Sequence, residues 1–184
     1  EGLYQHFKVI AESVDIPQIL YNVPARTACD LSFETIARLT EFDNIVGIKD
    51  ATGDLETGLR LMEAYGDRLA IYSGEDGLSR ELILAGADGT ISVTANVAPS
   101  LMTQMCAAAL IGDQAQAEQL DGSMTLLHES LFLEGNPVPV KWALAQMGMI
   151  SPALRLPLVE LSSRYHVQVS NALAAAGIEI NLNV

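Results

Sequence analysis

Residues 45–49 read IVGIK, an apolar run that ends in a lysine, and this stretch decides the predicted fold. A short run of apolar and β-branched residues is typical of a strand that is buried on both faces. Three further segments have the same character, namely residues 17–22 (PQILYN), 69–73 (LAIYS) and 89–94 (GTISVT). The four segments predict a parallel sheet wrapped by helices, since such strands need cover on both sides.

Helical patterns fill the gaps between the predicted strands. They cover residues 32–40, 55–64 and 78–84, and Ser32 is a plausible N-cap for the first of them. Gly66 and Gly86 are placed as helix-ending glycines. The strand starts fall about 20 to 28 residues apart, which is the size of a βα unit with short loops.

Only helical patterns follow the fourth predicted strand, at residues 99–112, 114–132, 137–148 and 158–177. A closed barrel needs eight strands, so four βα units amount to half of one. We therefore predict an α/β fold in which residues 1–112 form the C-terminal half of a (β/α)8 TIM barrel. Residues 113–184 then form a helical C-terminal domain. A doubly wound sheet is the competing architecture, although the chain lacks its GxGxxG motif.

The first residues of the chain already have helical periodicity. Leu3, Phe7, Ile10 and Ala11 recur at the spacing of an amphipathic helix, and the chain opens with Glu1 rather than Met. A domain seldom starts inside an element, so we expect further sequence upstream.

Composition excludes several classes of function. A net charge of −13 argues against a nucleic-acid surface, because neutralising phosphates requires clustered Lys and Arg. No apolar run approaches the roughly 20 residues of a membrane span, and no secretory signal is visible. Two cysteines, Cys29 and Cys106, form no disulfide framework or metal-ligand cluster. We expect a cytoplasmic protein without a metal.

Lys49 is the candidate nucleophile among three lysines. Lys8 lies in a polar helical pattern and Lys141 beside Trp142, where a solvated or snorkelling side chain is the expected role. Lys49 instead ends a predicted barrel strand, where active sites of this fold lie. Apolar walls there favour the neutral amine, which can attack a carbonyl to form an imine. Pairing with Asp50, or binding of a phosphate, is the alternative interpretation of its position.

Neighbouring strand ends favour the imine interpretation. Tyr21 ends the first predicted strand, where a phenol can relay protons to a developing carbinolamine. Arg26 follows in the next turn and offers a fork suited to a carboxylate. Gly74 follows the third strand and allows the backbone to approach a ligand closely. An amine, a phenol and a carboxylate clamp at strand ends indicate a keto-acid aldolase.

The motifs at these strand ends resemble those of the dihydrodipicolinate synthase family, within the pyruvate-dependent Schiff-base lyases and synthases. They are residues 21–27 (YNVPART), 47–54 (GIKDATGD), 73–76 (SGED), 89–97 (GTISVTANV) and 136–143 (NPVPVKWA). The resemblance implies that Lys49 forms an imine with pyruvate and that Tyr21 relays protons. It implies that Arg26 holds the carboxylate of aspartate semialdehyde, while Gly74 and Ile91 line the pyruvate pocket.

The same resemblance implies a class I aldolase-type synthase of lysine and diaminopimelate biosynthesis. It implies a cytoplasmic homotetramer, built as a dimer of dimers, with no metal or organic cofactor. The composition, as argued above, predicts no nucleic-acid or membrane partner. The family's pyruvate-carboxylate loop, its interface tyrosine and its lysine-feedback site belong to early strands that this chain lacks. We therefore expect these 184 residues alone to be inactive or nearly so.

Two other functions compete with this prediction. A sister enzyme could use the same Lys49 imine on another 2-keto acid, as an N-acetylneuraminate or keto-deoxy-sugar aldolase does. A non-catalytic half-barrel, serving as a fragment or an oligomerisation module, is the alternative from another class. Glu75 and Asp76 fit turn and helix-start chemistry better than a paired-carboxylate site. The three histidines are expected on the surface or satisfied in a core; they are His6, His128 and His166.

Overall fold

The computed structural model describes residues 1–180, which fall into two compact units. The first unit is Glu1–Ile91 and the second is Ser92–Val184, whose last four residues, 181–184, lie outside the described part. The expected boundary at residue 112, between the half-barrel and a helical domain ending at residue 184, stays a prediction.

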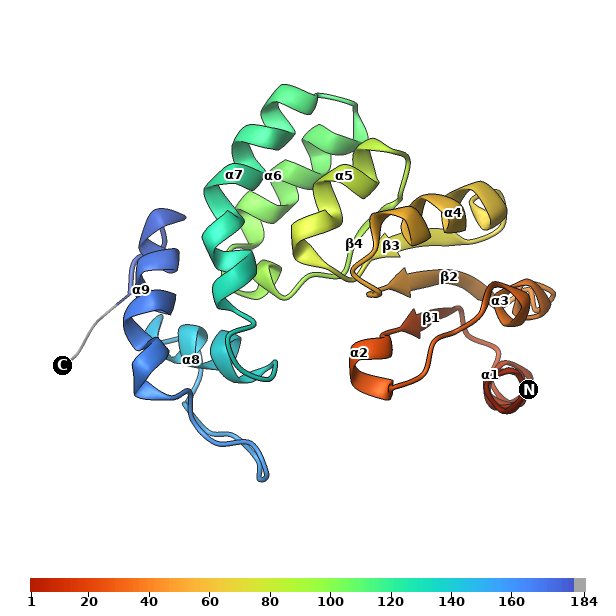
Figure 1. The fold of residues 1–184 in the computed structure, drawn as a ribbon, viewed down its shortest axis with the longest axis horizontal. Helices are drawn as coiled ribbons and strands as arrows, with labels where there is room; N and C mark the ends of the chain where they lie inside the picture. Colours follow the sequence, from red (N-terminus) through yellow and green to blue (C-terminus); the bar gives the residue numbers. More distant parts are fainter. Residues whose placement is uncertain (181–184) are drawn as a thin grey trace. The chain divides into compact units, whose positions relative to one another are not determined.

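A four-stranded parallel sheet forms the centre of the first unit, as predicted (Figure 1). Its strands lie in chain order: β1 (Gln18–Asn22), β2 (Ile45–Asp50), β3 (Ala70–Ser73) and β4 (Gly89–Thr90). The strands begin about where the sequence places them. Sequential neighbours pair in parallel, which requires the crossover helices that lie between them.

The fourth strand is shorter than predicted. It spans two residues, Gly89–Thr90, instead of residues 89–94. The chain then turns into a 3-10 helix, η2 (Thr94–Asn96). Local polar bonds favour the turn: the Ser92 hydroxyl accepts from the Ala95 N–H at 2.9 Å, and the Asn96 side chain donates to the Val93 carbonyl at 3.0 Å. Such side-chain bonds to nearby backbone compete with strand pairing.

Helices of the first unit occupy the predicted gaps. They are α1 (Gly2–Ser13), α2 (Pro24–Thr27), α3 (Phe33–Leu39), α4 (Leu55–Tyr65), η1 (Asp76–Leu78) and α5 (Ser79–Leu84). Ser32 caps α3 as expected, because its hydroxyl accepts from the Thr35 N–H at 3.2 Å. Gly66 is the C-cap of α4, and Gly86, at φ +118°, follows α5. The sequence carries no periodic signal for α2, because four residues are barely one turn.

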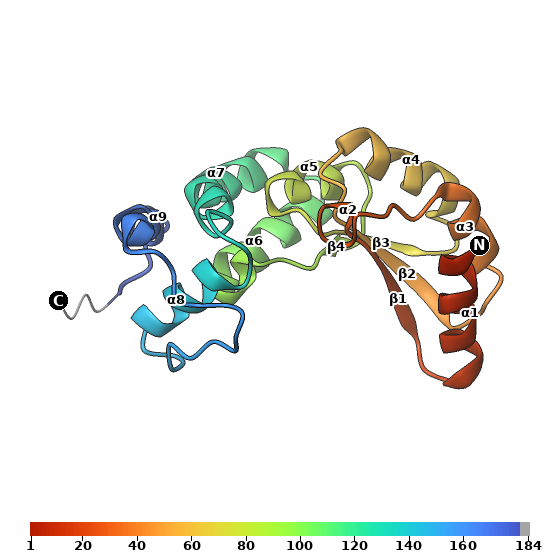
Figure 2. The same cartoon turned by 60° about the horizontal axis from the view of Figure 1, so that its bottom comes forward.

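The core of the first unit lies between one face of the sheet and α1, α3 and α4, which Figure 2 shows along that face. Its fully buried members are Leu20, Ile36, Leu39, Ile48, Leu61, Leu69 and Ile71. Along β1 the side chains alternate, as a strand requires: Leu20 is buried, Tyr21 exposed and Asn22 buried. Tyr21 therefore points away from the helix-covered face.

The second unit consists of helices. It contains α6 (Pro99–Leu110), α7 (Gln114–Ser130), α8 (Val138–Gln146), the 3-10 helix η3 (Ser163–Tyr165) and α9 (His166–Ala175). Gly112, at φ +75°, makes the tight turn between α6 and α7, which contact each other. Met105 of α6 and both Met124 and Leu127 of α7 are fully buried. None of the helices in residues 1–180 has both the length and the apolar character needed to span a membrane.

One helix prediction in the second unit is wrong at its start. The predicted helix covers residues 158–177, whereas α9 begins at His166 and residues 151–162 lie mostly outside regular structure. Side chains of α8 and α9 bond to the backbone of this segment instead: Lys141 Nζ donates to the Ala153 carbonyl at 2.7 Å, and His166 Nε2 contacts the Leu161 carbonyl at 2.9 Å.

Candidate active site

Lys49 and Tyr21 lie side by side at the carboxyl ends of β2 and β1. They are direct partners in the parallel ladder, so their side chains leave the sheet on the same face. Lys49 Nζ is 4.3 Å from the centroid of the Tyr21 ring. Tyr21 is 44% exposed, and Lys49 is only partly buried. The amine therefore remains accessible to a small molecule while resting against an aromatic surface.

The pKa of Lys49 is lowered from its ordinary value of 10.5. Partial burial is the main cause, because it removes water from the ammonium form. The positive charge of Arg26 lowers the pKa of Lys49 further, whereas the negative charge of Asp76 raises it. More of the amine is thus neutral near physiological pH than in an exposed lysine, and a neutral amine is the nucleophilic form.

Gly74 and Ile91 complete the row of strand ends. The Gly74 N–H donates to the Asp50 carbonyl at 2.6 Å, and the Ile91 N–H donates to the Ser73 carbonyl at 2.9 Å. A Cβ at Gly74 would lie 2.8 Å from the Lys49 Cε. Glycine at this position therefore leaves the space that the Lys49 side chain occupies. Ile91 is 42% exposed at the end of β4.

Arg26 is carried by the short helix α2, between β1 and α3. Pro24 starts the helix, and Ala28 ends it in the left-handed conformation at φ 52°, with its N–H donating to the Pro24 carbonyl. The Thr27 hydroxyl bonds to the carbonyls of Val23, at 3.2 Å, and Cys29, at 2.8 Å. Arg26 is exposed, yet its positive charge lowers the pKa of Lys49. The two cations are therefore close enough to repel each other.

Asp50 does not take the role of a partner for Lys49, which was the alternative interpretation. Its carboxylate accepts from the Thr52 hydroxyl at 2.8 Å and from Asn22 Nδ2 at 3.5 Å. Asp50 is 4% exposed and follows Lys49 along β2, so its side chain leaves the opposite face of the sheet.

The other two lysines behave as expected. Lys8 pairs with Glu12 at 3.8 Å, one turn along α1, where both side chains are exposed. Lys141 donates to a backbone carbonyl of the second unit. Lys49 is thus the lysine that lies beside a phenol at a strand end.

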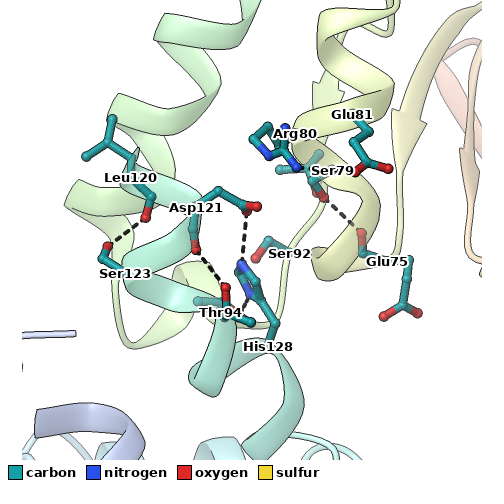
Figure 3. A network of polar contacts seen from close by, with 12 residues as sticks. Glu75, Ser79, Arg80, Glu81, Ser92, Thr94, Leu120, Asp121, Ser123 and His128 are labelled. Atoms are coloured by element: carbon teal, nitrogen blue, oxygen red, sulfur yellow. Dashed lines mark hydrogen bonds and ion pairs between the residues drawn. The ribbon is translucent and has the colours of Figure 1, made fainter. Parts of the chain in front are cut away.

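Asp76 is the residue near the site that sequence reasoning underrated. Turn chemistry does explain Glu75, whose N–H donates to the Ser73 hydroxyl at 3.2 Å. Its carbonyl accepts from the Ser79 hydroxyl at 3.0 Å (Figure 3). Asp76 is 1% exposed at the start of η1, and its charge raises the pKa of Lys49. A carboxylate in the SGED turn was available as a signal in the sequence, although only the tertiary structure relates it to Lys49.

A second polar cluster lies inside the helical unit, where Thr94, His128 and Asp121 form a chain (Figure 3). His128 Nδ1 is 2.9 Å from the Thr94 hydroxyl, and Nε2 is 3.4 Å from Asp121 Oδ1. The order of hydroxyl, imidazole and carboxylate matches a nucleophilic triad. However, Thr94 is 0% exposed and His128 8% exposed, so the hydroxyl offers no surface to a substrate. His128 therefore lies in the core of the helical unit, where Nδ1 is hydrogen-bonded to Thr94 and the 3.4 Å contact of Nε2 with Asp121 is not a hydrogen bond.

The remaining histidines and the cysteines show no ligand set. His6 is exposed and contacts the Phe7 ring, and His166 stacks on Trp142 at 4.6 Å between centroids. Cys29 and Cys106 are not disulfide-bonded within the described part of the chain. Within residues 1–180, no three side chains of His, Cys, Asp or Glu gather as a metal site requires.

Comparison with known proteins identifies the family. The sequence profile of the dihydrodipicolinate synthetase family matches residues 1–176, so the chain belongs to this family. The 4-hydroxy-tetrahydrodipicolinate synthase of Thioalkalivibrio sulfidiphilus is 58% identical over 181 residues, which are 98% of this chain and 62% of the relative. The relative of Nitrosospira multiformis has the same name and is 54% identical, with 100% of this chain and 61% of the relative covered.

Comparison with solved structures gives the same family. The chloride-inhibited dihydrodipicolinate synthase of Acinetobacter baumannii, complexed with pyruvate, superposes with a TM-score of 0.94 at 54% identity. That alignment covers 97% of this chain and 61% of the other. The chain thus spans about three fifths of the length of the relatives that it matches. The four-stranded parallel sheet and its helices are consistent with the C-terminal portion of their barrel, which confirms the predicted fold class.

Proposed function

We propose that this chain carries the Schiff-base lysine of a synthase that condenses pyruvate with aspartate semialdehyde to 4-hydroxy-tetrahydrodipicolinate. The observation that carries the proposal is the pairing of Lys49 with Tyr21 at adjacent strand ends, where Nζ lies 4.3 Å from the phenol ring. The names of the relatives supply the product, and the pyruvate complex of the A. baumannii structure supplies one substrate. Aspartate semialdehyde, the second substrate, is implied by the resemblance of the motifs to the family.

The first chemical step is imine formation. The neutral Lys49 amine attacks the C2 carbonyl carbon of pyruvate, and the carbonyl oxygen takes up a proton to give a carbinolamine. Loss of water then leaves a protonated imine. Tyr21 is the group beside Nζ that can deliver and retrieve these protons. Gly74 packs against the Lys49 side chain, and in this proposal Gly74 and Ile91 line the space for the small keto acid.

Carbon–carbon bond formation follows. The iminium serves as an electron sink, so a proton leaves the pyruvate methyl carbon and an enamine forms. Its carbon attacks the aldehyde carbon of aspartate semialdehyde, whose oxygen becomes a hydroxyl. Cyclisation by the substrate's own amine releases Lys49. Arg26 is exposed on α2 beside the site, and its guanidinium is suited to hold the carboxylate of this second substrate.

The alignment with the T. sulfidiphilus synthase covers 62% of that relative, which is therefore longer than this chain. We propose that the sheet needs the other strands of the barrel for activity, and that the complete protein is a cytoplasmic homo-oligomer. One solved relative is described as a monomeric variant, so the oligomeric state has to be measured, by sedimentation for example.

Borohydride trapping tests the proposal. The chain is joined behind the N-terminal portion of the T. sulfidiphilus relative to give a full-length synthase, which is reduced in the presence of pyruvate. We expect a stable carboxyethyl adduct on Lys49, located by peptide mass spectrometry. Lys49→Ala should abolish the adduct, whereas Lys141→Ala is the matched control and should retain it. An adduct on Lys141, or none in the unsubstituted enzyme, contradicts the mechanism.

The aldehyde partner distinguishes the synthase from its sister enzymes. With the Lys49 adduct established, turnover is measured with pyruvate and either aspartate semialdehyde or sugar aldehydes. We expect turnover with aspartate semialdehyde, because the Arg26-Thr27 turn resembles that of the synthase. Preference for a sugar aldehyde would retain the imine and reject the proposed second substrate.

A further inference from the structure

A buried asparagine lies between the Arg26 turn and the end of the lysine strand. Asn22 follows Tyr21 on β1 and is 4% exposed. Its Nδ2 donates to Asp30 Oδ1 at 2.8 Å and reaches Asp50 Oδ1 at 3.5 Å, while its Oδ1 accepts from the Leu31 N–H at 3.1 Å. One side-chain amide thus bonds both to the far end of the turn at residues 23–30 and to the strand that carries Lys49.

The chemistry of these partners fixes the orientation of the amide. Two carboxylates, Asp30 and Asp50, face Nδ2, and an N–H faces Oδ1. The opposite orientation would place an oxygen against two acceptors and a donor against a donor. Asparagine is therefore specific at this position: aspartate would add a third carboxylate, and an aliphatic residue would leave the Leu31 N–H without this acceptor.

Strand register explains why this contact bears on the site. Asn22 pairs with Asp50 in the ladder, as Tyr21 pairs with Lys49 one residue earlier. The Ala51 N–H also donates to the Asn22 carbonyl at 2.9 Å, which extends the pairing beyond the strand ends. Tyr21 and Lys49 use one face of the sheet, and Asn22 and Asp50 use the other. The turn that carries Arg26 is therefore anchored on the reverse side of the same two strand ends.

The electrostatics of Asp50 are consistent with a tight, buried cluster. Burial is the main cause that raises the pKa of Asp50, and the nearby charge of Asp30 raises it as well. Hydrogen bonds from Thr52 and Asn22 lower the pKa of Asp50 and so compensate in part. Loss of the Asn22 amide would remove a donor shared by the two carboxylates.

We infer that Asn22 is a positioning residue, which holds the turn at residues 23–30 against the ends of β1 and β2 and so places Arg26 for the second substrate. The part of the inference that concerns the turn rests on the contacts of Asn22 alone. The part that concerns substrate rests on the proposed function, in which Arg26 binds the carboxylate of aspartate semialdehyde.

Limited trypsinolysis of the chain tests the turn directly, because Arg26 is itself a cleavage site. Cleavage of a native protein follows the population in which the segment opens. We expect Asn22→Ala to accelerate cleavage after Arg26 by about tenfold or more, the factor that corresponds to a lost hydrogen bond to a charged group. Asn44→Ala is the matched control, because Asn44 Nδ2 also ties a loop, through the carbonyls of Ala11 and Val14, away from Arg26.

Asp30→Ala keeps the test decisive if the Asn22 variant fails to fold. Asp30 is exposed, so its removal deletes the 2.8 Å bond without opening a core cavity. We expect faster cleavage after Arg26, by roughly threefold or more, with an unchanged melting temperature. Cleavage within about twofold of the unsubstituted chain in both variants, or equal acceleration by Asn44→Ala, overturns the inference.

Kinetics of the full-length synthase test the substrate part. For Asn22→Ala we expect the KM for aspartate semialdehyde to rise about tenfold or more, with borohydride trapping of pyruvate on Lys49 within about twofold. Asn44→Ala should change neither quantity. Equal loss of pyruvate trapping would show general damage to the site and reject the positioning role. Absence of trapping in the unsubstituted enzyme rejects the proposed function instead, and leaves the trypsin result to decide the role of Asn22.

Discussion

The two units each contain a polar cluster with the residue types of an active site, but their surroundings differ. At the strand ends of the first unit, Tyr21 is 44% exposed and Lys49 is partly buried. In the helical unit, Thr94 is 0% exposed and His128 8% exposed. Reactive residue types and short distances are therefore insufficient to define a site. Access to the reacting atom separates the candidate nucleophile from the structural cluster.

The two clusters also differ in how their polar atoms are satisfied. His128 Nδ1 lies 2.9 Å from the Thr94 hydroxyl, in a buried setting where a missing partner is costly. Lys49 rests on the face of the Tyr21 ring, and burial lowers its pKa. Satisfied groups stabilise a fold, whereas a partly desolvated amine is available for reaction.

Removing the phenol should have the largest effect. We expect Tyr21→Phe in the full-length synthase to slow imine formation with pyruvate by about 10²- to 10⁴-fold, because a positioned acid–base group contributes that much. Tyr72→Phe is the control, since Tyr72 lies on β3 and is the ladder partner of Lys49 on the opposite side from Tyr21. The measurement is the rate of borohydride-trappable adduct. An equal loss in both variants would mean that the Tyr21 hydroxyl has no specific role as the proton relay.

The buried histidine should matter for stability alone. We expect His128→Ala to lower the free energy of unfolding by about 1–3 kcal/mol, because the buried hydrogen bond between His128 and the Thr94 hydroxyl is lost. Urea denaturation followed by circular dichroism measures this change, and Lys49 trapping in the folded variant should remain intact. His6→Ala, at an exposed position, is the control and should change stability little. Loss of trapping without loss of stability would make the helical cluster catalytic and undo the comparison.

Substitution of two glycines, Gly74 and Gly77, tests how closely the chain packs around Lys49. A Cβ at Gly74 would lie 2.8 Å from both Lys49 Cε and Ala51 Cβ, and 2.9 Å from the Asp50 carbonyl oxygen. We expect Gly74→Ala to cost about 1–3 kcal/mol of stability and to raise the KM for pyruvate, since the lysine must move. At Gly77 a Cβ meets nothing within 4 Å, so Gly77→Ala is the matched control. Equal effects of the two substitutions would contradict close packing at Gly74.

Changing the charges around the Lys49 amine should have the smallest effect on the trapping rate. The sign of the charge that is removed determines whether the pKa of Lys49 rises or falls. Asp76 raises the pKa of Lys49, so Asp76→Asn should lower this pKa further and increase the neutral fraction. Arg26 lowers the pKa of Lys49, so Arg26→Gln should raise it. We expect changes in trapping rate at neutral pH below about tenfold, in opposite directions.

The pH dependence of trapping measures these shifts. Its midpoint in the unsubstituted enzyme should lie below 10.5, the ordinary pKa of a lysine. Asp67→Asn, at an exposed position, is the control. Shifts of the same sign in the Asp76 and Arg26 variants would reject the electrostatic account of Lys49.

Much of the fold is predictable because its signals are local. Strand starts at Ile45 and Gly89 follow from apolar runs between turn formers, and Ser32 was recognisable as a helix cap. The failures share a physical cause. Residues 91–94 have strand-like composition but make local polar bonds. Residues 158–165 have helical composition, but the carbonyl of Leu161 in this segment bonds to the His166 side chain. In both segments, specific hydrogen bonds outweigh weak propensity.

Some residues of the site were also recognisable from the sequence, and others were not. Lys49, Tyr21 and Gly74 were recognisable because strand ends of a parallel sheet meet at one edge, and the structure brings these three together. The roles of Asn22 and Asp76 were not recognisable, since their relation to the site runs through contacts between residues far apart in the chain. No spacing in a single sequence reveals which buried carboxylate faces which amine.

By itself the sequence determined the order of strands and helices, the family motifs and the lysine at the end of IVGIK, because periodicity and turn chemistry act over a few residues. The tertiary structure decided what surrounds that lysine: the ring of Tyr21 at 4.3 Å, the space left by Gly74 and the buried amide of Asn22 behind the Arg26 turn. It also decided that the Thr94–His128 cluster is closed to substrate. Burial and the distances between remote residues are properties of the packed chain, and reactivity depends on both.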